Sequence, residues 1–478
     1  MGQEIDDCAF CEADFIHFQN QLKQEYAALS DWVACDAFAQ DEITAGVELE
    51  AWLIDRDFNP APINAEFLQD LSDPMVVTEL SKFNIELNVT PQPLQGKALS
   101  KLEEEFSRTW MKCDRKAADF DAHMVMIGIL PTVSDGHLTL KNISNVNRYH
   151  ALNEQVFKAR QGRPMDLNII GREHLQSRHY DLMLEAAATS MQLHLQVDVD
   201  KAVRFYNASM VLSAPMVAIA ANSPYMFDTD LWDETRIPVF EQAVQVGGYD
   251  GAALGPIKRV TFGSDYMHNS FLECFRENLE HYPVLLPTRF DETTNKLPYL
   301  RFHNGTIWRW NRPLIGFGEN GKPHVRIEHR VMAAGPTAVD MIANAALYYG
   351  AVVGLASDFR VVESLIPFAV ARDNFYAAAR NGLNAHVIWD EGNKLTVRRL
   401  ILDQLLPLAQ RGLEILKIDS GDINRLLGVI ERRASSGQNG ADWQRRFYSG
   451  AGQDMHAMVR RYYAMQQVGE PVHSWDLA

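Results

Sequence analysis

The chain has 478 residues, with 45 Lys and Arg against 62 Asp and Glu, which gives a formal net charge of −17. Nucleic acids are held by clustered Lys and Arg, so we expect no nucleic-acid partner for this acidic chain. Hydrophobic residues make up 47% and charged residues 22% of the sequence, which excludes a disordered chain. The N-terminal sequence MGQEIDDCAF is acidic and lacks the features of a secretory signal, so we expect a cytoplasmic protein.

Hydrophobic periodicity predicts helices and strands that do not alternate regularly along the chain. The first element is a helix within residues 15–40. Strands are predicted near 43–54, 84–90, 123–129, 166–170, 191–198, 298–303, 306–310 and 324–332. Helices are predicted near 95–121, 146–160, 177–188, 201–220 and 231–245, and almost throughout the chain from about 336. This order predicts an α+β fold with C-terminal helices packed on one face of a sheet.

The sequence shows no linker, repeat or low-complexity tract that would mark a domain boundary. The longest uncharged stretch, 341–357, contains Asn344 and falls short of the ~20 strongly apolar residues that span a bilayer. We therefore predict a buried helix there and no membrane partner. Gly350 and Gly354 within it predict a close contact with another helix.

Two motifs resemble functional signatures but lack the required context. GFGENGKP, residues 316–323, satisfies GxGxxG, but the following HVRIEHRV has the period of a strand and no helix follows to bind phosphate. Asn320 and Gly321 instead predict a hairpin turn. Cys8 and Cys11 form a lone CxxC without a second ligand pair, so we predict neither a zinc site nor, with five cysteines in all, a disulfide framework.

The most informative feature is a set of strands whose polar faces carry acidic residues. Glu48 and Glu50 alternate with apolar residues in GVELEAWLI, and Glu86 does so in KFNIELNVTP, seven residues after Glu79. The same alternation places His194 on the polar face of MQLHLQVDV, and Arg326, Glu328 and Arg330 on one face of HVRIEHRV. Each strand alone fits a solvated surface.

If these faces converge, the carboxylates need cations. Two carboxylates about 4 Å apart repel by roughly 4 kcal/mol at an effective dielectric constant near 20. Oxygen ligands with one imidazole favour Mg²⁺ or Mn²⁺ over a metal selected by thiolates.

A second polar run, YLRFHNGTIWRWNRP, contains Arg301, His303, Arg309 and Arg312. Spacing two places Arg301 and His303 on one face of a predicted strand. The run favours an anion site for polyphosphate or a carboxylate about as strongly as an arginine-rich edge paired with surface acids.

Six of these segments, in this order, resemble the carboxylate–amine ligases of the glutamate–cysteine ligase type 2 family, which are related in fold to glutamine synthetase. The segments are GVELEAWL (46–53), ELSKFNIELNVTPQPL (79–94), EAAATSMQLHLQVD (185–198), NSPYMFD (222–228) followed by Arg236, RFHNGTIWRWNRP (301–313) and VRIEHRVMAAGPTAVD (325–340). The resemblance implies a glutamine synthetase-like catalytic domain over 1–478. A curved, mainly antiparallel sheet of about six strands would form a funnel with helices on its outer face. The motifs do not explain the helical extensions at about 1–40 and 395–478.

The resemblance also implies the residues of an active site with two or three Mg²⁺ or Mn²⁺ ions and ATP. The implied metal ligands are Glu48, Glu50, Glu79, Glu86, His194 and Glu328. Arg330 and Arg236 are the implied catalytic residues. Arg301, His303, Arg312 and Arg326 are the implied contacts for phosphate or substrate.

The implied reaction is the phosphorylation of a carboxylate by ATP, followed by attack of an amine on the acyl phosphate to form an amide. Glutamate is the expected carboxylate substrate, so the product would be a γ-glutamyl amide. The expected partners are small molecules, namely ATP, glutamate or a similar amino acid, and an amine, and the sequence is compatible with a homo-oligomer. The sequence identifies neither the amine nor the base that deprotonates it.

Two alternatives remain open from the sequence. The first is an ATP-dependent phosphotransferase of the guanidino-kinase type, in which the phosphoryl group stays on the acceptor. The second is a relative that binds ligands without turnover, although retention of the clustered carboxylates argues against it.

Overall fold

The computed structural model describes residues 4–5, 9–39, 42–246, 258–291, 294–390, 392–450 and 452–477. Its helices are α1 (Glu12–Ala34), α2 (Asn64–Leu71), α3 (Ala98–Ala118), α4 (Asn147–Ala159), α5 (Ala202–Ile219), α6 (Arg236–Ala243), α7 (Leu272–His281), α8 (Pro298–Gly305), α9 (Ala338–Ser357), α10 (Val362–Leu365), α11 (Phe368–Asn381), α12 (Val397–Leu400), α13 (Leu406–Ile415), α14 (Ser420–Ser436), α15 (Gly440–Gly450) and α16 (Met455–Val468). A 3₁₀ turn, η3 (Leu182–Ala187), precedes the strand that carries His194.

The strands of the main sheet are β1 (Thr44–Asp55), β2 (Val76–Thr78), β3 (Asn84–Asn88), β4 (Gln92–Pro93), β5 (Ala122–Val125), β8 (Ser190–Val197), β13 (Asn311–Phe317) and β14 (Pro323–Ala333). The short pairs outside it are β6 (Met165–Ile170) with β7 (His174–His179), β9 (Tyr225–Met226) with β10 (Thr229–Asp230), β11 (Val260–Thr261) with β12 (Trp308–Arg309), and β15 (His386–Trp389) with β16 (Asn393–Thr396).

The main sheet contains an antiparallel path of six strands in the order β13-β14-β8-β1-β3-β2, with β4 and β5 paired to β1. The path curls strongly into a half-barrel, which confirms the expected α+β fold with a curved antiparallel sheet. The polar residues of β1 alternate with buried Val47, Leu49 and Ala51, so one face of the sheet is apolar.

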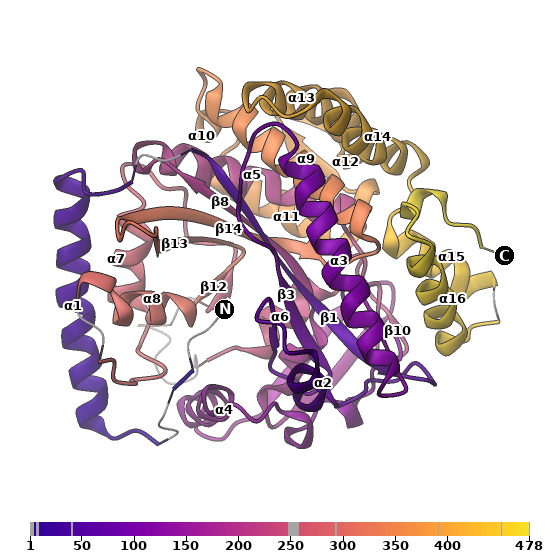
Figure 1. Ribbon diagram of the computed structural model, residues 1–478, viewed down its shortest axis with the longest axis horizontal. Helices are drawn as coiled ribbons and strands as arrows, with labels where there is room; N and C mark the ends of the chain where they lie inside the picture. Colours follow the sequence, from indigo (N-terminus) through magenta and orange to yellow (C-terminus); the bar gives the residue numbers. More distant parts are fainter. Residues whose placement is uncertain are drawn as a thin grey trace.

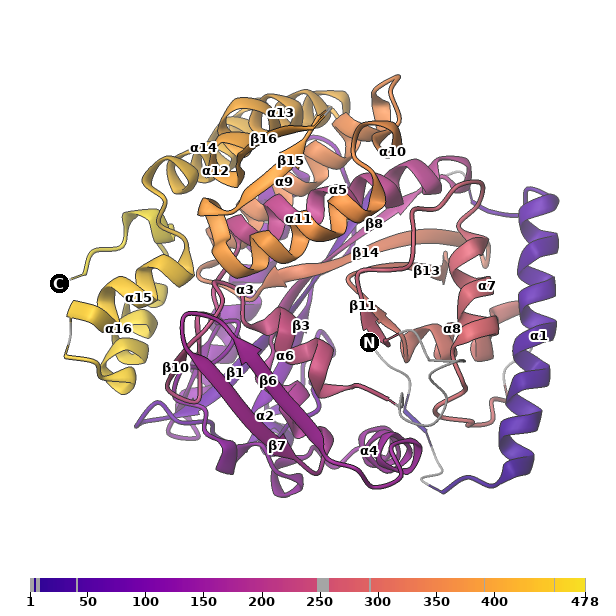
Figure 2. The same ribbon diagram turned by 180° about the vertical axis from the view of Figure 1, so that it is seen from behind.

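Helices cover the apolar face of the sheet. In Figure 1, α3 lies in front of the strands, while α1, α7 and α8 form a separate group beside β13. Seen from behind in Figure 2, α5 and α11 lie near α9 and α13, and α4 lies at the opposite end of the molecule. The hydroxyl of Tyr349 on α9 donates hydrogen bonds to the carbonyl oxygens of Gly46 and His194, at 3.0 and 3.3 Å. The helix thereby fixes the two strands that carry site residues.

The two longest apolar segments are core helices of this fold. The helical stretches Val199–Ile219 and Ala338–Ser357 are long and apolar enough to cross a membrane, but 89% and 78% of their most apolar windows are buried inside the protein. Gly350 and Gly354 of α9 contact α13 closely, as predicted. A Cβ on Gly350 would lie 2.3 Å from the carbonyl oxygen of Ala409, and one on Gly412 would lie 1.8 Å from that of Gly350.

The C-terminal helices complete the core. The guanidinium of Arg433 on α14 is buried and forms an ion pair of 2.6 Å with Asp340 on α9. It also donates a 2.6 Å hydrogen bond to Asn344. On α16, the Tyr462 hydroxyl donates to the carbonyl oxygen of Met126, at 2.8 Å. The C-terminal segment therefore supplies partners for polar groups that lie deep in the protein.

Several local predictions are confirmed. Helix α1 covers most of the expected range and begins three residues earlier, at Glu12, and Gly321, at φ +75°, lies in the hairpin that joins β13 to β14. Cys11 at the start of α1 and Cys35 are exposed and free, and Cys113 and Cys274 are buried and free, whereas Cys8 lies outside the described residues.

Three local predictions were wrong. Residues 298–303 form the helix α8, not a strand, because Pro298 occupies its first turn and Phe302 and His303 pack toward Phe18 of α1. Residues 177–188 form the end of β7 and the turn η3, not a helix. The hairpin β15–β16 interrupts the C-terminal region that was expected to be helical.

Candidate active site

The polar face of the sheet lines a cavity of about 280 Å³. The register of the strands brings the acidic residues together. Glu50 on β1 lies opposite Glu86 on β3, and Glu328 on β14 lies opposite His194 on β8. The polar faces of these strands therefore converge on one surface, which is the condition under which their carboxylates need cations. Ten of the predicted residues line the cavity: Glu48, Glu50, Glu79, Glu86, His194, Arg301, Arg312, Arg326, Glu328 and Arg330.

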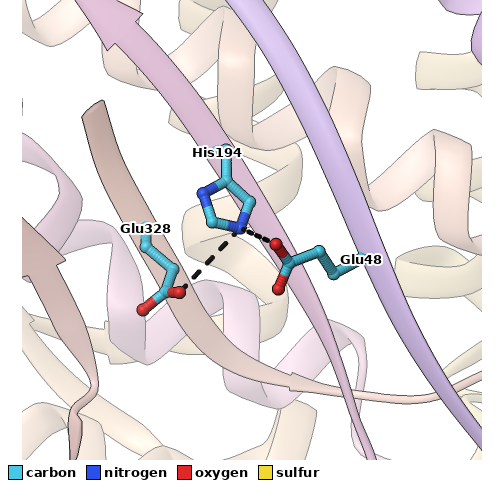
Figure 3. Close-up of side chains that lie close together, drawn as sticks. All are labelled: Glu48, His194 and Glu328. Atoms are coloured by element: carbon cyan, nitrogen blue, oxygen red, sulfur yellow. Dashed lines mark ion pairs between the residues drawn. The ribbon is translucent and has the colours of Figure 1, made fainter. Parts of the chain in front are cut away.

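One cluster in this cavity centres on His194 and is called here the histidine cluster, consisting of Glu48, His194 and Glu328. One ligand atom from each lies within 4.8 Å of the others. Figure 3 shows the imidazole between the two carboxylates, with its Nε2 at 3.1 Å from Glu48 Oε1 and 3.9 Å from Glu328 Oε1. This nitrogen is buried but makes no hydrogen bond within the part of the chain described. A buried imidazole nitrogen facing two carboxylates is an arrangement that could hold a metal ion.

Arginines supply positive charge to the histidine cluster. Arg312 on β13 donates two hydrogen bonds to Glu328, at 2.7 and 3.0 Å, and a guanidinium nitrogen of Arg330 lies 3.2 Å from the same carboxylate. Burial disfavours the ionised form of Glu328, but Arg312 and Arg330 outweigh it and hold the pKa well below its usual range. Burial likewise opposes ionisation of Glu48, and the charge of His194 reverses the effect, so the pKa of Glu48 is lowered.

The second cluster, called here the glutamate cluster, consists of Glu50, Glu79, Glu86 and Glu185. Burial raises the pKa of Glu50 to about 7, against the opposing charge of Arg330. Burial and the charge of neighbouring carboxylates raise the pKa to about 7 for Glu79 and to about 8 for Glu86 and Glu185. Without added cations this cluster therefore retains protons near neutral pH.

Hydrogen bonds fix several side chains of the glutamate cluster. Glu50 accepts hydrogen bonds from the backbone nitrogen of Ser190, at 2.6 Å, and from Gln192 Nε2, at 2.9 Å. Glu86 accepts one from Asn88, at 3.0 Å. A carboxylate oxygen can accept more than one interaction, so these bonds leave sites for a cation. Carboxylate oxygens with one imidazole suit a hard divalent ion, so the residues present fit Mg²⁺ or Mn²⁺.

Two predicted residues lie outside the lining of the cavity. Arg236 is buried, forms a 3.1 Å ion pair with Glu234 and donates to the carbonyl oxygen of Val331. The positive charge of Arg236 still interacts electrostatically with Glu50. His303 lies on α8 and is buried, with Nε2 at 3.1 Å from the carbonyl oxygen of Asn278, because the helix turns this side chain inward. Burial lowers the pKa of His303 to about 4.

Sequence reasoning assigned no role to three polar residues that line the cavity, Arg148, Glu185 and Gln192. Gln192 shares the polar face of β8 with His194 and accepts a hydrogen bond from Arg330. The alternation on β8 could have identified it. Arg148 begins a helix and Glu185 lies in a 3₁₀ turn, so no periodic signal marked either one.

Comparisons with known proteins agree with this architecture. The sequence matches the family described as glutamate-cysteine ligase family 2 over residues 44–465. A search of curated proteins found no significant match. The structure resembles the glutamate–cysteine ligase of Francisella tularensis, solved in complex with AMP, at a TM-score of 0.51 and 11% identity, covering 92% of this chain and 91% of that one. It also resembles a bifunctional glutathione synthetase from Pasteurella multocida, at a TM-score of 0.53 and 10% identity, covering 95% of this chain and 55% of that one. At these identities the structural likeness concerns the fold.

Proposed function

The chain belongs to glutamate-cysteine ligase family 2, whose members are ATP-dependent carboxylate–amine ligases that use Mg²⁺, and we propose that it forms an amide by this chemistry. The observation that carries the proposal is the cavity on the inner face of the sheet. There, buried carboxylates, one imidazole and several arginines face a common space. A structural role alone would not account for so many acidic groups at such a cost in desolvation.

We assign the histidine cluster and three residues of the glutamate cluster to metal binding. The histidine cluster would hold one ion, and Glu50, Glu79 and Glu86 would hold one or two more. Bound Mg²⁺ supplies charge neutralisation for the phosphoryl oxygens of ATP. Metal binding would release the protons that the glutamate cluster retains.

The arginines are assigned to the transferred phosphoryl group and the carboxylate substrate. Arg330 lines the cavity between Glu328 and Gln192, and its guanidinium would stabilise charge on the phosphoryl group in transfer. Arg301, Arg312 and Arg326 would contact phosphate or carboxylate oxygens. Arg236 would act through the electrostatic effect of its charge on Glu50. His303 remains a predicted contact for phosphate or substrate, although its buried position does not favour that role.

The proposed reaction has two steps. An oxygen of the substrate carboxylate attacks the γ-phosphorus of ATP, so an O–P bond forms, the β–γ bridging bond breaks and ADP leaves. The lone pair of the amine then attacks the acyl carbon, phosphate leaves with the electrons of the C–O bond, and the amine nitrogen loses a proton. We propose glutamate as the carboxylate substrate, activated at its side chain, so that the product is a γ-glutamyl amide.

The test is Mg²⁺-dependent release of ADP and phosphate from ATP with glutamate, alone and with a panel of amines that includes cysteine, with products identified by mass spectrometry. An amide formed in equal amount to phosphate is the expected result. ADP with a phosphorylated acceptor would instead identify a phosphotransferase. Binding of Mg-ATP by calorimetry without turnover on any pair would favour a ligand-binding protein, and no binding of Mg-ATP would overturn the proposal.

A further inference from the structure

Helix α1 belongs to the N-terminal extension, to which the assignments above give no role. It lies against α7 and α8 in both views of the molecule (Figures 1 and 2). Five of its residues recur at spacings of three and four and so form one stripe along the helix: Phe18, Leu22, Glu25, Leu29 and Trp32. Glu25 is the charged member of the stripe, and it is fully buried. A buried carboxylate in an apolar stripe is costly unless it has a specific partner.

The partner of Glu25 is the start of α8. Pro298 is the first residue of this helix, and the preceding Leu297 has an apolar side chain that cannot act as an N-cap. Glu25 supplies the acceptor instead, because its Oε2 accepts a 2.8 Å hydrogen bond from the backbone nitrogen of Leu300. A negative charge at the N-terminus of a helix also interacts favourably with the helix dipole. The N-terminal extension therefore provides the cap that the sequence before α8 does not.

The start of α8 depends on its surroundings in a second way. Leu297 has a φ of +49°, in the left-handed region that leucine rarely adopts. Such a conformation persists where neighbouring contacts hold it in place. Phe18 of α1 contributes to these contacts, because its ring packs against those of Tyr299 and Phe302, with centroids 5.0 and 6.4 Å away. Loosening α1 would therefore loosen the first turns of α8.

A further contact from α1 reaches the same wall of the cavity. Trp32 packs edge-on against Phe317 of β13, with ring centroids 6.1 Å apart. The guanidinium of Arg301 on α8 lies over the ring of Phe317, 5.6 Å from its centroid. Arg301 is thus supported at its backbone through Glu25 and at its guanidinium through Phe317 and Trp32. Glu25 and Trp32 stand seven residues apart on one face of α1, so a single helix provides both supports.

We propose that α1 is a brace that positions Arg301 at the wall of the cavity, with Glu25 and Trp32 as positioning residues. Arg301 and the neighbouring Phe302 both line the cavity, so a shift of α8 changes the surface that a ligand meets. The inference rests on the proposed function for the role of Arg301, which is to contact phosphate or carboxylate oxygens. It gives the N-terminal extension a part in that contact.

The experiment measures hydrogen exchange at the backbone amides of α8 and the affinity for ligands, both in the full chain. Glu25→Ala removes the acceptor, and Glu25→Gln keeps an acceptor of the same shape without the charge. Trp32→Ala removes the second support. Arg301→Gln is made alone and in combination with Glu25→Ala and with Trp32→Ala, and Asp31→Asn, exposed on α1, is the matched control. Calorimetry uses Mg²⁺ with a non-hydrolysable ATP analogue and, in a second titration, glutamate added to that complex.

Glu25→Ala should accelerate exchange in the first turn of α8 by about 5- to 30-fold, the range expected for loss of a helix cap. Glu25→Gln should exchange at an intermediate rate, because its amide oxygen still accepts the hydrogen bond. Asp31→Asn should exchange as the unchanged protein does. If Glu25→Ala does not fold, the intermediate rate of Glu25→Gln carries the test.

Arg301→Gln should weaken one of the two ligands by about 10- to 100-fold, the range for a hydrogen bond to a charged group. Glu25→Ala and Trp32→Ala should weaken the same ligand by a smaller factor, because they displace the guanidinium without removing it. Combining either with Arg301→Gln should cause no further loss, since both act through Arg301. A general loss of stability would instead add to the effect of Arg301→Gln.

The inference is overturned if both Glu25 variants leave exchange at α8 unchanged. It is also overturned if the losses in affinity of Glu25→Ala and Arg301→Gln add in full, or if the ligands bind and Arg301→Gln weakens neither of them. If the unchanged protein binds neither ligand, the proposed function fails. The exchange rates of α8 then decide by themselves whether α1 supports this helix, so the two failures are distinguished.

Discussion

The histidine cluster and the glutamate cluster line the same cavity, yet the pKa values of their carboxylates are shifted in opposite directions. Arg312, Arg330 and His194 lower the pKa of the carboxylates in the first, whereas burial and mutual repulsion raise the pKa of those in the second. The protein thus supplies positively charged side chains to the histidine cluster, whereas the glutamate cluster depends on protons or metal ions for neutralisation. Acidic residues of equal spacing in the sequence are therefore not equivalent, because their neighbours determine their charge.

The largest expected effect is on turnover. Glu50→Gln removes a proposed metal ligand from the glutamate cluster without changing its shape, and should lower Mg²⁺-dependent turnover by more than about 100-fold, beyond the usual cost of changing an outer-shell partner. The measurement is ADP release at saturating Mg²⁺, with circular dichroism as the check on folding. Glu66→Gln, at an exposed position on α2, is the matched control. Full activity of Glu50→Gln would refute the metal assignment.

The second prediction compares the free energy of unfolding of one variant from each cluster, measured with EDTA present to remove metal ions. Glu328→Gln leaves Arg312 buried without a carboxylate and should cost about 3–5 kcal/mol in the free energy of unfolding. Glu86→Gln should cost nothing at pH 8, since it removes a group that repels its neighbours. Urea denaturation of both variants tests this, and equal losses would show that the clusters do not differ.

The third prediction concerns pH. In the metal-free protein, Glu50, Glu79 and Glu86 retain protons up to a pKa of about 7 or 8, while the unfolded chain loses them near 4.5. Between these values the folded state binds more protons, so its stability falls as the pH rises from 4.5 to 8. Mg²⁺ should reduce this fall, because the ion replaces the protons.

Melting temperatures measured across this range, with EDTA and with Mg²⁺, provide the test of the third prediction. The carboxylates of the histidine cluster have lowered pKa values, so their contribution acts in the opposite direction. It is present above 4.5 and is lost as the pH falls below that value. A metal-free stability that rises between pH 4.5 and 8 would contradict the proposed difference between the clusters.

The smallest expected effect is at the N-terminal cysteines, to which no role is assigned. Cys11 is exposed at the start of α1, so the double variant Cys8→Ser/Cys11→Ser should retain the turnover of the unchanged protein. The same ADP assay measures it. Loss of activity in a folded double variant would reveal a function of these thiols that the two clusters do not explain.

The sequence predicted the sheet and most of the cavity because β1, β3, β8 and β14 show period-two alternation, and antiparallel pairing brings their polar faces together. It failed at α8, where Arg301 and His303 also stand two residues apart. Tertiary packing against Phe18 favours a helix there, and a two-residue spacing over six positions cannot separate the structures. Glu185 and Arg148 lie outside regular strands, so their place in the cavity depends on long-range folding that no local pattern reports.

The buried ion pair between Arg433 and Asp340 has a consequence for how the protein is made. Asp340, at the start of α9, is separated from its guanidinium partner by more than ninety residues of chain, and α9 also holds the strands of the cavity through Tyr349. During synthesis, the proposed catalytic residues therefore leave the ribosome long before Arg433, the side chain that pairs with Asp340 on α9. Final assembly of the cavity must await the emergence of α14.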